Sequence, residues 1–218
     1  MPGSHNAIFL QPHIVQGVNG PITSPATPGC DRILTHVAPK LVESHEDDAF
    51  AGVANTISCL GLGSDGTLRS HGIFSEAGFV HAPKSLDWLP AATLTCTWTT
   101  AWNALFGLKD REAGPDLWVL VQGTGGVSMA ALQLAVAVGA SVIVTTSSDE
   151  KGARLKTLDA THVLNYQTHP ETWGEDARAL TPTPGGKGVD VVIDVGGNEI
   201  LPESLAAVRV DGIVLVID

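Results

Sequence analysis

Apolar and polar positions follow one another in clear blocks over the C-terminal half of the chain. Residues 117–122 form a short apolar run with Trp and Val, which favour an extended backbone. After a glycine-rich turn, residues 127–138 are almost free of polar side chains, rich in Ala and Leu, and closed by a glycine. Such a segment indicates a buried helix. Residues 141–146 are a second β-branched run, so the pattern predicts a strand–turn–helix–strand unit.

The same alternation continues towards residue 218. Helices are predicted over 149–158, 170–180 and 200–208, and strands over 163–166, 189–195 and 213–217. The first of these helices begins beside Ser148 and Asp149, which are both suitable N-caps. The run 189–195 is too apolar to be half exposed, as is typical of a central parallel strand. The C-terminal half is therefore predicted to be α/β, with a doubly wound parallel sheet.

The N-terminal half has a weaker pattern. Residues 1–29 mix Pro, Gly, Ser and Asn with brief apolar pieces, and 17–29 are predicted to be loop. Short strands are predicted at 32–37, 69–74 and 77–81, whereas 49–62 fit a helix or a strand equally well. From Pro90 the pattern changes to a helix over 91–106, ended by Gly107. The chain is accordingly divided into domains 1–89 and 90–218.

Composition and charge exclude several classes of protein. Of 218 residues, 44% are apolar and 16% are charged, which is a core-forming composition. A net charge of −11 with 12 basic residues argues against binding to nucleic acid or to an anionic membrane. The chain has no apolar segment of spanning length and no secretory pattern at its start. Cys30, Cys59 and Cys96 are far apart, as in a reducing compartment, so a cytoplasmic location is predicted.

The turn Gly123-Thr124-Gly125-Gly126 is the candidate binding motif. Glycines there would let backbone N–H groups, those of Gly126 and Val127 in particular, approach a pyrophosphate at the positive end of the helix. Ser128 stands where the dinucleotide fingerprint has its third glycine. A tight turn in an α/β protein that binds no nucleotide is the alternative interpretation.

Three stretches resemble the medium-chain dehydrogenase/reductase superfamily: LVQGTGGVSMAALQLAVAVGASVIVTTSSDEK, LDATHVLNY and GVDVVIDVGG. They are similar to zinc-independent quinone and enoyl reductases and to zinc-type alcohol dehydrogenase homologues. A fourth stretch, PAATLTCTWTTAWNALF, resembles the helix that joins the catalytic and coenzyme domains of that family. The resemblance covers residues 29–218. It implies a Rossmann domain preceded by a partial GroES-like, β-rich part with an irregular tail. Because family members have more chain at both ends, the sequence is expected to be a shortened member.

The resemblance also implies an NAD(P)H coenzyme, with NADP(H) favoured over NAD(H). Ser147 stands where an NAD-selective fold places an acid. With Ser148, Lys151 and Tyr166 it resembles the 2′-phosphate and adenine clamp of NADP-preferring relatives, since a cation and hydroxyls suit a dianionic phosphate. Asp149 argues instead for NAD(H), and Lys151 also fits a solvated helix position.

At the nicotinamide end, the resemblance places Thr100 and Val195 near the ring. Cys96 matches a zinc ligand of zinc-dependent relatives, but a catalytic zinc needs three protein ligands. The eight histidines show no metal-ligand spacing. We therefore expect no zinc, and we predict that Cys96 is a small buried residue.

These features predict an NADPH-dependent oxidoreductase that transfers a hydride to a carbonyl or an activated C=C bond of a small organic substrate. No catalytic residue is identified, since Thr100 is only placed near the nicotinamide, and no hydrolase motif is present. The alternatives are an inactive family member that binds nucleotide or another protein, and a fragment without function. The strand from Ile213 to Ile217 would be an open sheet edge, which predicts a homo-oligomer or a partner chain.

Overall fold

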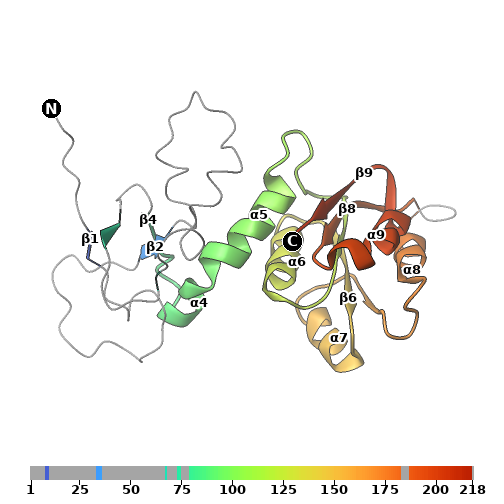
Figure 1. Cartoon of the computed structure of the whole chain (residues 1–218), viewed down its shortest axis with the longest axis horizontal. Helices are drawn as coiled ribbons and strands as arrows, with labels where there is room; N and C mark the ends of the chain where they lie inside the picture. Colours follow the sequence, from blue (N-terminus) through green and yellow to red (C-terminus); the bar gives the residue numbers. More distant parts are fainter. Residues whose placement is uncertain are drawn as a thin grey trace. The chain divides into compact units, whose positions relative to one another are not determined.

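The computed structural model describes residues 8–9, 33–35, 67, 73–74, 79–182 and 187–217. It divides the chain into two compact units, residues 1–96 and 97–218 (Figure 1). In the first unit, β1 (Ile8–Phe9) pairs antiparallel with β3 (Ile73–Phe74), and β2 (Ile33–Thr35) with β4 (Phe79–His81). The strands predicted at 32–37, 69–74 and 77–81 are thus confirmed in shorter form. The loop at 17–29, the ambiguous segment 49–62 and most of the GroES-like part lie outside the described residues.

The single helix predicted over 91–106 is wrong. The segment consists of α4 (Trp88–Ala92), a π-helical turn η2 (Leu94–Trp98) and α5 (Thr99–Phe106). Five threonines lie between residues 93 and 100, and β-branched side chains weaken a regular α-helix. The hydroxyl of Thr93 also donates to the carbonyl oxygen of Pro90 at 2.8 Å, which favours ending α4 there.

The second unit is built on a five-stranded sheet in the order β7-β6-β5-β8-β9, with every pair parallel. Its strands are β5 (Trp118–Val121), β6 (Ser141–Thr146), β7 (His162–Asn165), β8 (Val189–Asp194) and β9 (Val208–Val216). From β5 the chain continues to β6 and β7 on one side of the sheet, and then to β8 and β9 on the other side of β5. The doubly wound Rossmann sheet is therefore confirmed, and its topological switch point lies between β5 and β8.

The helices of this unit are α6 (Gly126–Ala137), α7 (Asp149–Lys156), α8 (Trp173–Ala179) and α9 (Leu201–Ala207), with a 3-10 turn η3 (Gly197–Glu199). Two predicted boundaries differ from the observed ones by three residues or more. Helix α8 begins three residues later than predicted, because a turn closed by the Thr172 N–H bond to His169 O at 3.4 Å precedes it and Thr172 is its N-cap. Strand β9 begins five residues early, because Val208 pairs with Val189 ahead of a register shift. Within the ranges given above, no helix is long and apolar enough to span a membrane.

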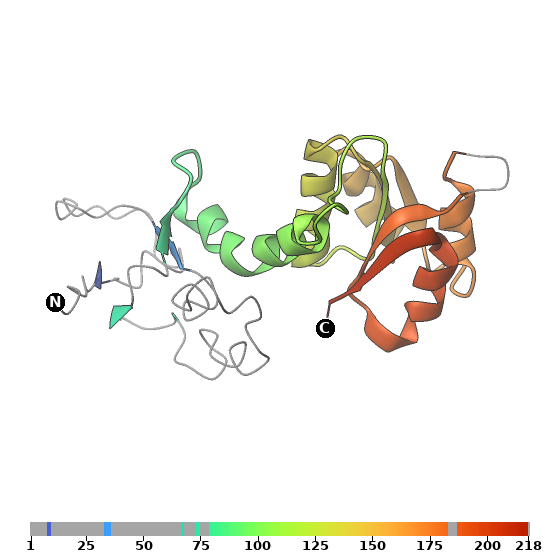
Figure 2. The ribbon, with the colours of Figure 1, turned by 90° about the horizontal axis from the view of Figure 1, so that it is seen from above.

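Helices cover both faces of the sheet (Figure 2). On one face, Val119 and Val121 of β5 pack with residues of α5 and α6 and with Leu155 of α7. On the other, Leu120 packs with Trp173 of α8 and with α9. Successive strand residues point to opposite faces, so both kinds of position must be apolar. This double burial explains the continuous apolar runs of the sequence.

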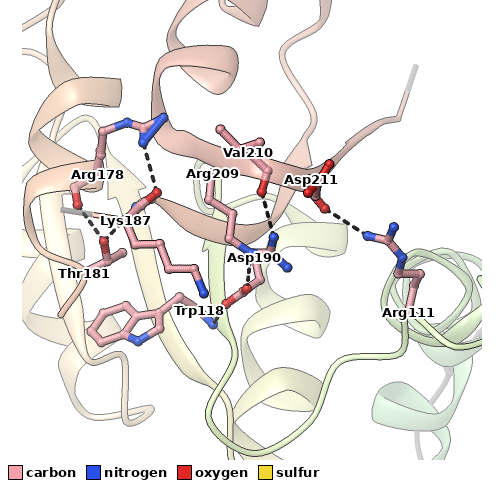
Figure 3. Close-up of polar contacts among 10 residues, drawn as sticks. Arg111, Trp118, Arg178, Thr181, Lys187, Asp190, Arg209, Val210 and Asp211 are labelled. Carbon is pink, nitrogen blue, oxygen red and sulfur yellow. Dashed lines mark hydrogen bonds and ion pairs between the residues drawn. The ribbon is translucent and has the colours of Figure 1, made fainter. Parts of the chain in front are cut away.

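A carboxylate joins the amino ends of β5 and β8 to β9 (Figure 3). One oxygen of Asp190 accepts the N–H of Trp118 at 2.8 Å, and the other accepts Nε of Arg209 at 2.5 Å. Both side chains are mostly buried, with 13% of Asp190 and 24% of Arg209 exposed. These contacts lie at the amino ends of the strands. They connect β8 to β5 and to β9, so they hold the sheet together.

Arg178 of α8 strengthens the same region. Its guanidinium donates to three carbonyl oxygens at 2.7–3.0 Å, those of Lys187, Ala206 and Val208. Arg111 similarly donates to the carbonyl oxygen of Asp211 at 2.9 Å (Figure 3). These arginines tie α8 and the loop before β5 to the segment around the start of β9.

Candidate coenzyme site

The glycine turn connects β5 to α6 at the carboxyl edge of the sheet. Gly123 has φ +72°, a left-handed conformation that glycine adopts without strain. Its N–H donates to the hydroxyl of Thr145 on β6 at 3.1 Å, which anchors the start of the turn. Gly125 is the N-cap of α6, with extended φ and ψ of −74° and 176°.

The N-terminus of α6 presents unused donors. Its first backbone hydrogen bond runs from Met129 N–H to Gly125 O at 2.9 Å. The N–H groups of Gly126, Val127 and Ser128 precede that bond, and the described part of the chain offers them no acceptor. The first turn carries no acidic side chain. These donors and the positive end of the helix dipole suit an anion such as a pyrophosphate.

The glycines also differ in the space around them. A Cβ atom on Gly123 or Gly125 would meet no atom within 4 Å, so the approach to the turn is open. A Cβ on Gly126 would instead lie 2.7 Å from Cγ2 of Thr97. Gly126 is therefore needed for packing against the end of η2, whereas Gly125 leaves room that a ligand can use. The residues present fit a dinucleotide pyrophosphate.

Ser128 replaces the third glycine of the fingerprint without opening the helix–strand packing. Its side chain is buried, and its hydroxyl donates to the carbonyl oxygen of Gln122 at 2.7 Å. The bond joins the first turn of α6 to the end of β5. A small hydroxyl side chain thus satisfies a strand carbonyl that the turn leaves free.

The residues predicted to clamp a 2′-phosphate come together at the carboxyl ends of β6 and β7. Thr146 is paired with Asn165, so Ser147 and Tyr166 follow at neighbouring positions, and Tyr166 N–H donates to Thr146 O at 3.0 Å. Ser148 is the N-cap of α7, as predicted, and accepts Lys151 N–H at 3.3 Å.

Lys151 and Asp149 differ in their partners. The side chain of Lys151 is exposed on the first turn of α7, and no described residue pairs with its ammonium group. Asp149 accepts the side-chain amide of Asn165 at 2.9 Å, so one of its carboxylate oxygens is already engaged. Of these two charged side chains, Lys151 is therefore the one without a partner among the described residues.

The carboxyl end of β8 forms the other side of the switch point. Val195 follows the strand and is 36% exposed, next to Gly196 and Gly197. Beneath this loop, Asp194 is fully buried and accepts a hydrogen bond from Ser204 of α9 at 2.7 Å. Gln122 at the end of β5 is also buried and donates to Ser204 at 2.5 Å. Sequence reasoning missed this cluster, although Gln122 and Asp194 both end apolar runs.

Thr100 and Cys96 were the remaining sequence predictions. Thr100 is half-buried on the first turn of α5, a helix that packs against α6. The prediction that Cys96 is buried is wrong, because it is exposed on η2, where π-helical geometry breaks the 3.6-residue periodicity. Over the residues that the structure describes, no group of three His, Cys, Asp or Glu side chains is placed to hold a metal ion. Those residues do not fit a zinc site, and zinc independence stays a prediction.

Comparison with known proteins gives a consistent assignment. The family model for zinc-binding dehydrogenases matches residues 126–217. A zinc-type alcohol dehydrogenase-like protein of Schizosaccharomyces pombe is 46% identical over 162 residues, which is 74% of this chain and 46% of that protein. The chain thus spans about half the length of the curated relatives it matches.

Solved structures agree. An NAD-dependent alcohol dehydrogenase superposes with a TM-score of 0.70 at 30% identity, covering 90% of this chain and 56% of that one. The CurK enoyl reductase gives a TM-score of 0.60 at 31% identity, covering 69% and 43%. The matched family region contains α6 and the strands that follow it, which is the coenzyme-binding half of these oxidoreductases. The chain belongs to the medium-chain dehydrogenase/reductase superfamily.

Proposed function

We propose that the chain binds NADPH and serves an oxidoreductase that transfers a hydride to a carbonyl or an activated C=C bond of a small organic substrate. The observation that carries the proposal is the N-terminus of α6, where the first N–H groups have no acceptor among the described residues and the space beside Gly125 is open. The likeness to alcohol dehydrogenase-like proteins and to an enoyl reductase supports the reaction class. Residues 1–89 are proposed to belong to the catalytic domain and residues 90–218 to form the coenzyme domain.

The residues of this chain act mainly by binding and orientation. When bound, the reduced nicotinamide supplies a hydride to the electrophilic carbon of the substrate, whose oxygen or neighbouring carbon then takes a proton. Gly126 and Val127 would hold the pyrophosphate through their N–H groups. The exposed apolar side chain of Val195 suits one face of the nicotinamide ring, and Thr100 is proposed to lie near that ring.

NADPH is proposed over NADH because of the corner between β6 and β7. Ser147 carries a hydroxyl, and Lys151 an ammonium group that no described residue pairs with; both groups suit a dianionic 2′-phosphate. The carboxylate that would select NADH, that of Asp149, already accepts a hydrogen bond from Asn165. NADH remains the competing coenzyme, as the NAD-dependent neighbour illustrates.

Replacing Lys151 tests this preference. Lys151→Ala should weaken NADPH binding about 5- to 30-fold, because a charge-assisted hydrogen bond at an exposed site contributes about 1–2 kcal/mol. NADH binding should not change. The measurement is a titration of both coenzymes by nicotinamide fluorescence, with Lys156→Ala, an exposed lysine at the other end of α7, as the matched control. Equal losses for NADPH and NADH would contradict the assignment of the 2′-phosphate corner.

The edge strand β9 is the proposed site of self-association or of a partner chain. Among the described strands it pairs only with β8, and Val216 is 53% exposed. Lysine on an edge strand opposes further pairing. Val216→Lys should therefore lower the sedimentation coefficient to that of a monomer, whereas Val80→Lys, also on an exposed valine, should not. This pairing would be refuted if the parent chain sedimented as a monomer and the backbone amides of Ile213 to Val216 that point away from β8 exchanged rapidly.

The cytoplasmic location stays a prediction.

A further inference from the structure

A chain of buried hydrogen bonds lies beneath the loop that follows β8. It starts at Nε2 of Gln122, which donates to Oγ of Ser204 at 2.5 Å. That hydroxyl donates to Oδ2 of Asp194 at 2.7 Å. Oδ1 of the same carboxylate accepts the backbone N–H groups of Gly196 and Gly197, each at 3.0 Å. The side chains come from β5, α9 and β8, so the network joins three elements at the switch point.

The direction of these bonds is determined by their chemistry. A carboxylate only accepts, so the single proton of the Ser204 hydroxyl must point to Asp194 for that bond to exist. The hydroxyl has a competing acceptor, the carbonyl oxygen of Ile200, at 3.5 Å. An N–H from Gln122 occupies an oxygen lone pair of Ser204 and thereby favours the orientation towards Asp194. The amide nitrogen of Gln122 must therefore face Ser204.

The other end of the Gln122 amide is unpaired. Gln122 is 2% exposed, and its Oε1 has no hydrogen-bond partner in the described part of the chain. Burying an acceptor without a partner is destabilising. The side chain of Gln122 is therefore expected to contribute little to stability, and its role lies in the one bond that the side chain makes.

We propose that Gln122 and Ser204 are positioning residues that act through Asp194 to hold the loop from Val195 to Gly197. This inference rests on the proposed function, which puts the loop at the nicotinamide end of the site. Asp194 holds two successive backbone N–H groups, so the orientation of its carboxylate sets the path of the loop. Loosening the network should affect the nicotinamide end of a bound coenzyme and leave the adenine end, at β6 and β7, unchanged.

The first test needs no coenzyme. In Gln122→Met, a substitution of similar shape, amide hydrogen exchange at Gly196 and Gly197 should become about tenfold faster, the factor expected for losing one hydrogen bond. The midpoint of chemical unfolding should not fall, since the unpaired Oε1 is removed as well. Ser204→Ala should accelerate the same two amides at least as much. The matched control is Gln133→Met on the exposed face of α6.

The second test separates the two ends of the site. Gln122→Met should weaken NADPH about tenfold and leave the binding of adenosine 2′,5′-bisphosphate, an adenine-end fragment, unchanged. Unchanged exchange at Gly196 and Gly197, or equal losses for both ligands, would overturn the inference. A parent chain that binds neither ligand would overturn the proposed function, and the exchange comparison would still decide whether the network holds the loop.

Discussion

A Gly125→Val chain is expected to fold like the parent chain and to bind NADPH about 100-fold more weakly, a loss of about 2.8 kcal/mol. Gly125 has an extended backbone that valine adopts readily, and its Cβ would meet no atom within 4 Å. The added side chain would stand in the open space before the free N–H groups of α6, where phosphate oxygens must approach. As an N-cap, valine should lower the free energy of unfolding by at most about 1 kcal/mol.

The control for this experiment is Gly114→Val. A Cβ atom on Gly114 would also meet no atom within 4 Å, but this glycine lies in the loop before β5, away from the carboxyl edge. Nicotinamide fluorescence should show normal NADPH binding for that variant. If Gly125→Val bound NADPH as tightly as Gly114→Val, the helix N-terminus would not be the pyrophosphate site.

The largest loss of stability is expected from Asp190→Ala, which should lower the free energy of unfolding by about 2–4 kcal/mol. The substitution removes the acceptor of the Trp118 N–H and leaves Arg209 without its ion-pair partner in a mostly buried position. Because Asp190 joins β5 and β9 through β8, the loss weakens three of the five strands at their amino ends.

Chemical denaturation followed by circular dichroism measures this effect. Asp190→Asn keeps an acceptor for the Trp118 N–H, so its free energy of unfolding should fall by only about half as much. Glu171→Ala, which removes an exposed carboxylate, should change stability by less than about 0.5 kcal/mol. If Asp190→Ala lost no more stability than Glu171→Ala, the contacts of Asp190 with Trp118 and Arg209 would not hold the sheet together.

The elements of the second unit were predictable because each leaves a local signal. Parallel strands buried on both faces are continuous apolar runs, and β6 was predicted at its observed bounds. The glycine turn and the Ser148 cap are also local, since each motif lies within a few residues of chain. Local signals failed where backbone geometry departs from the regular α-helix. The π-helical turn at Leu94–Trp98 divided the predicted helix, and Cys96, which lies on this turn, is exposed.

The sequence by itself thus determined the strand–helix order, the open glycine turn and the set of residues at the ends of β6 and β7. The tertiary structure alone decided which polar groups meet at the two ends of β5 and β8. Gln122 and Ser204 are 82 positions apart, and Trp118 and Asp190 are 72 apart. Such pairs have no periodicity to reveal them. They form because parallel pairing places β8 beside β5, so Asp190 lies close to Trp118, and α9, which follows β8, brings Ser204 to the end of β5.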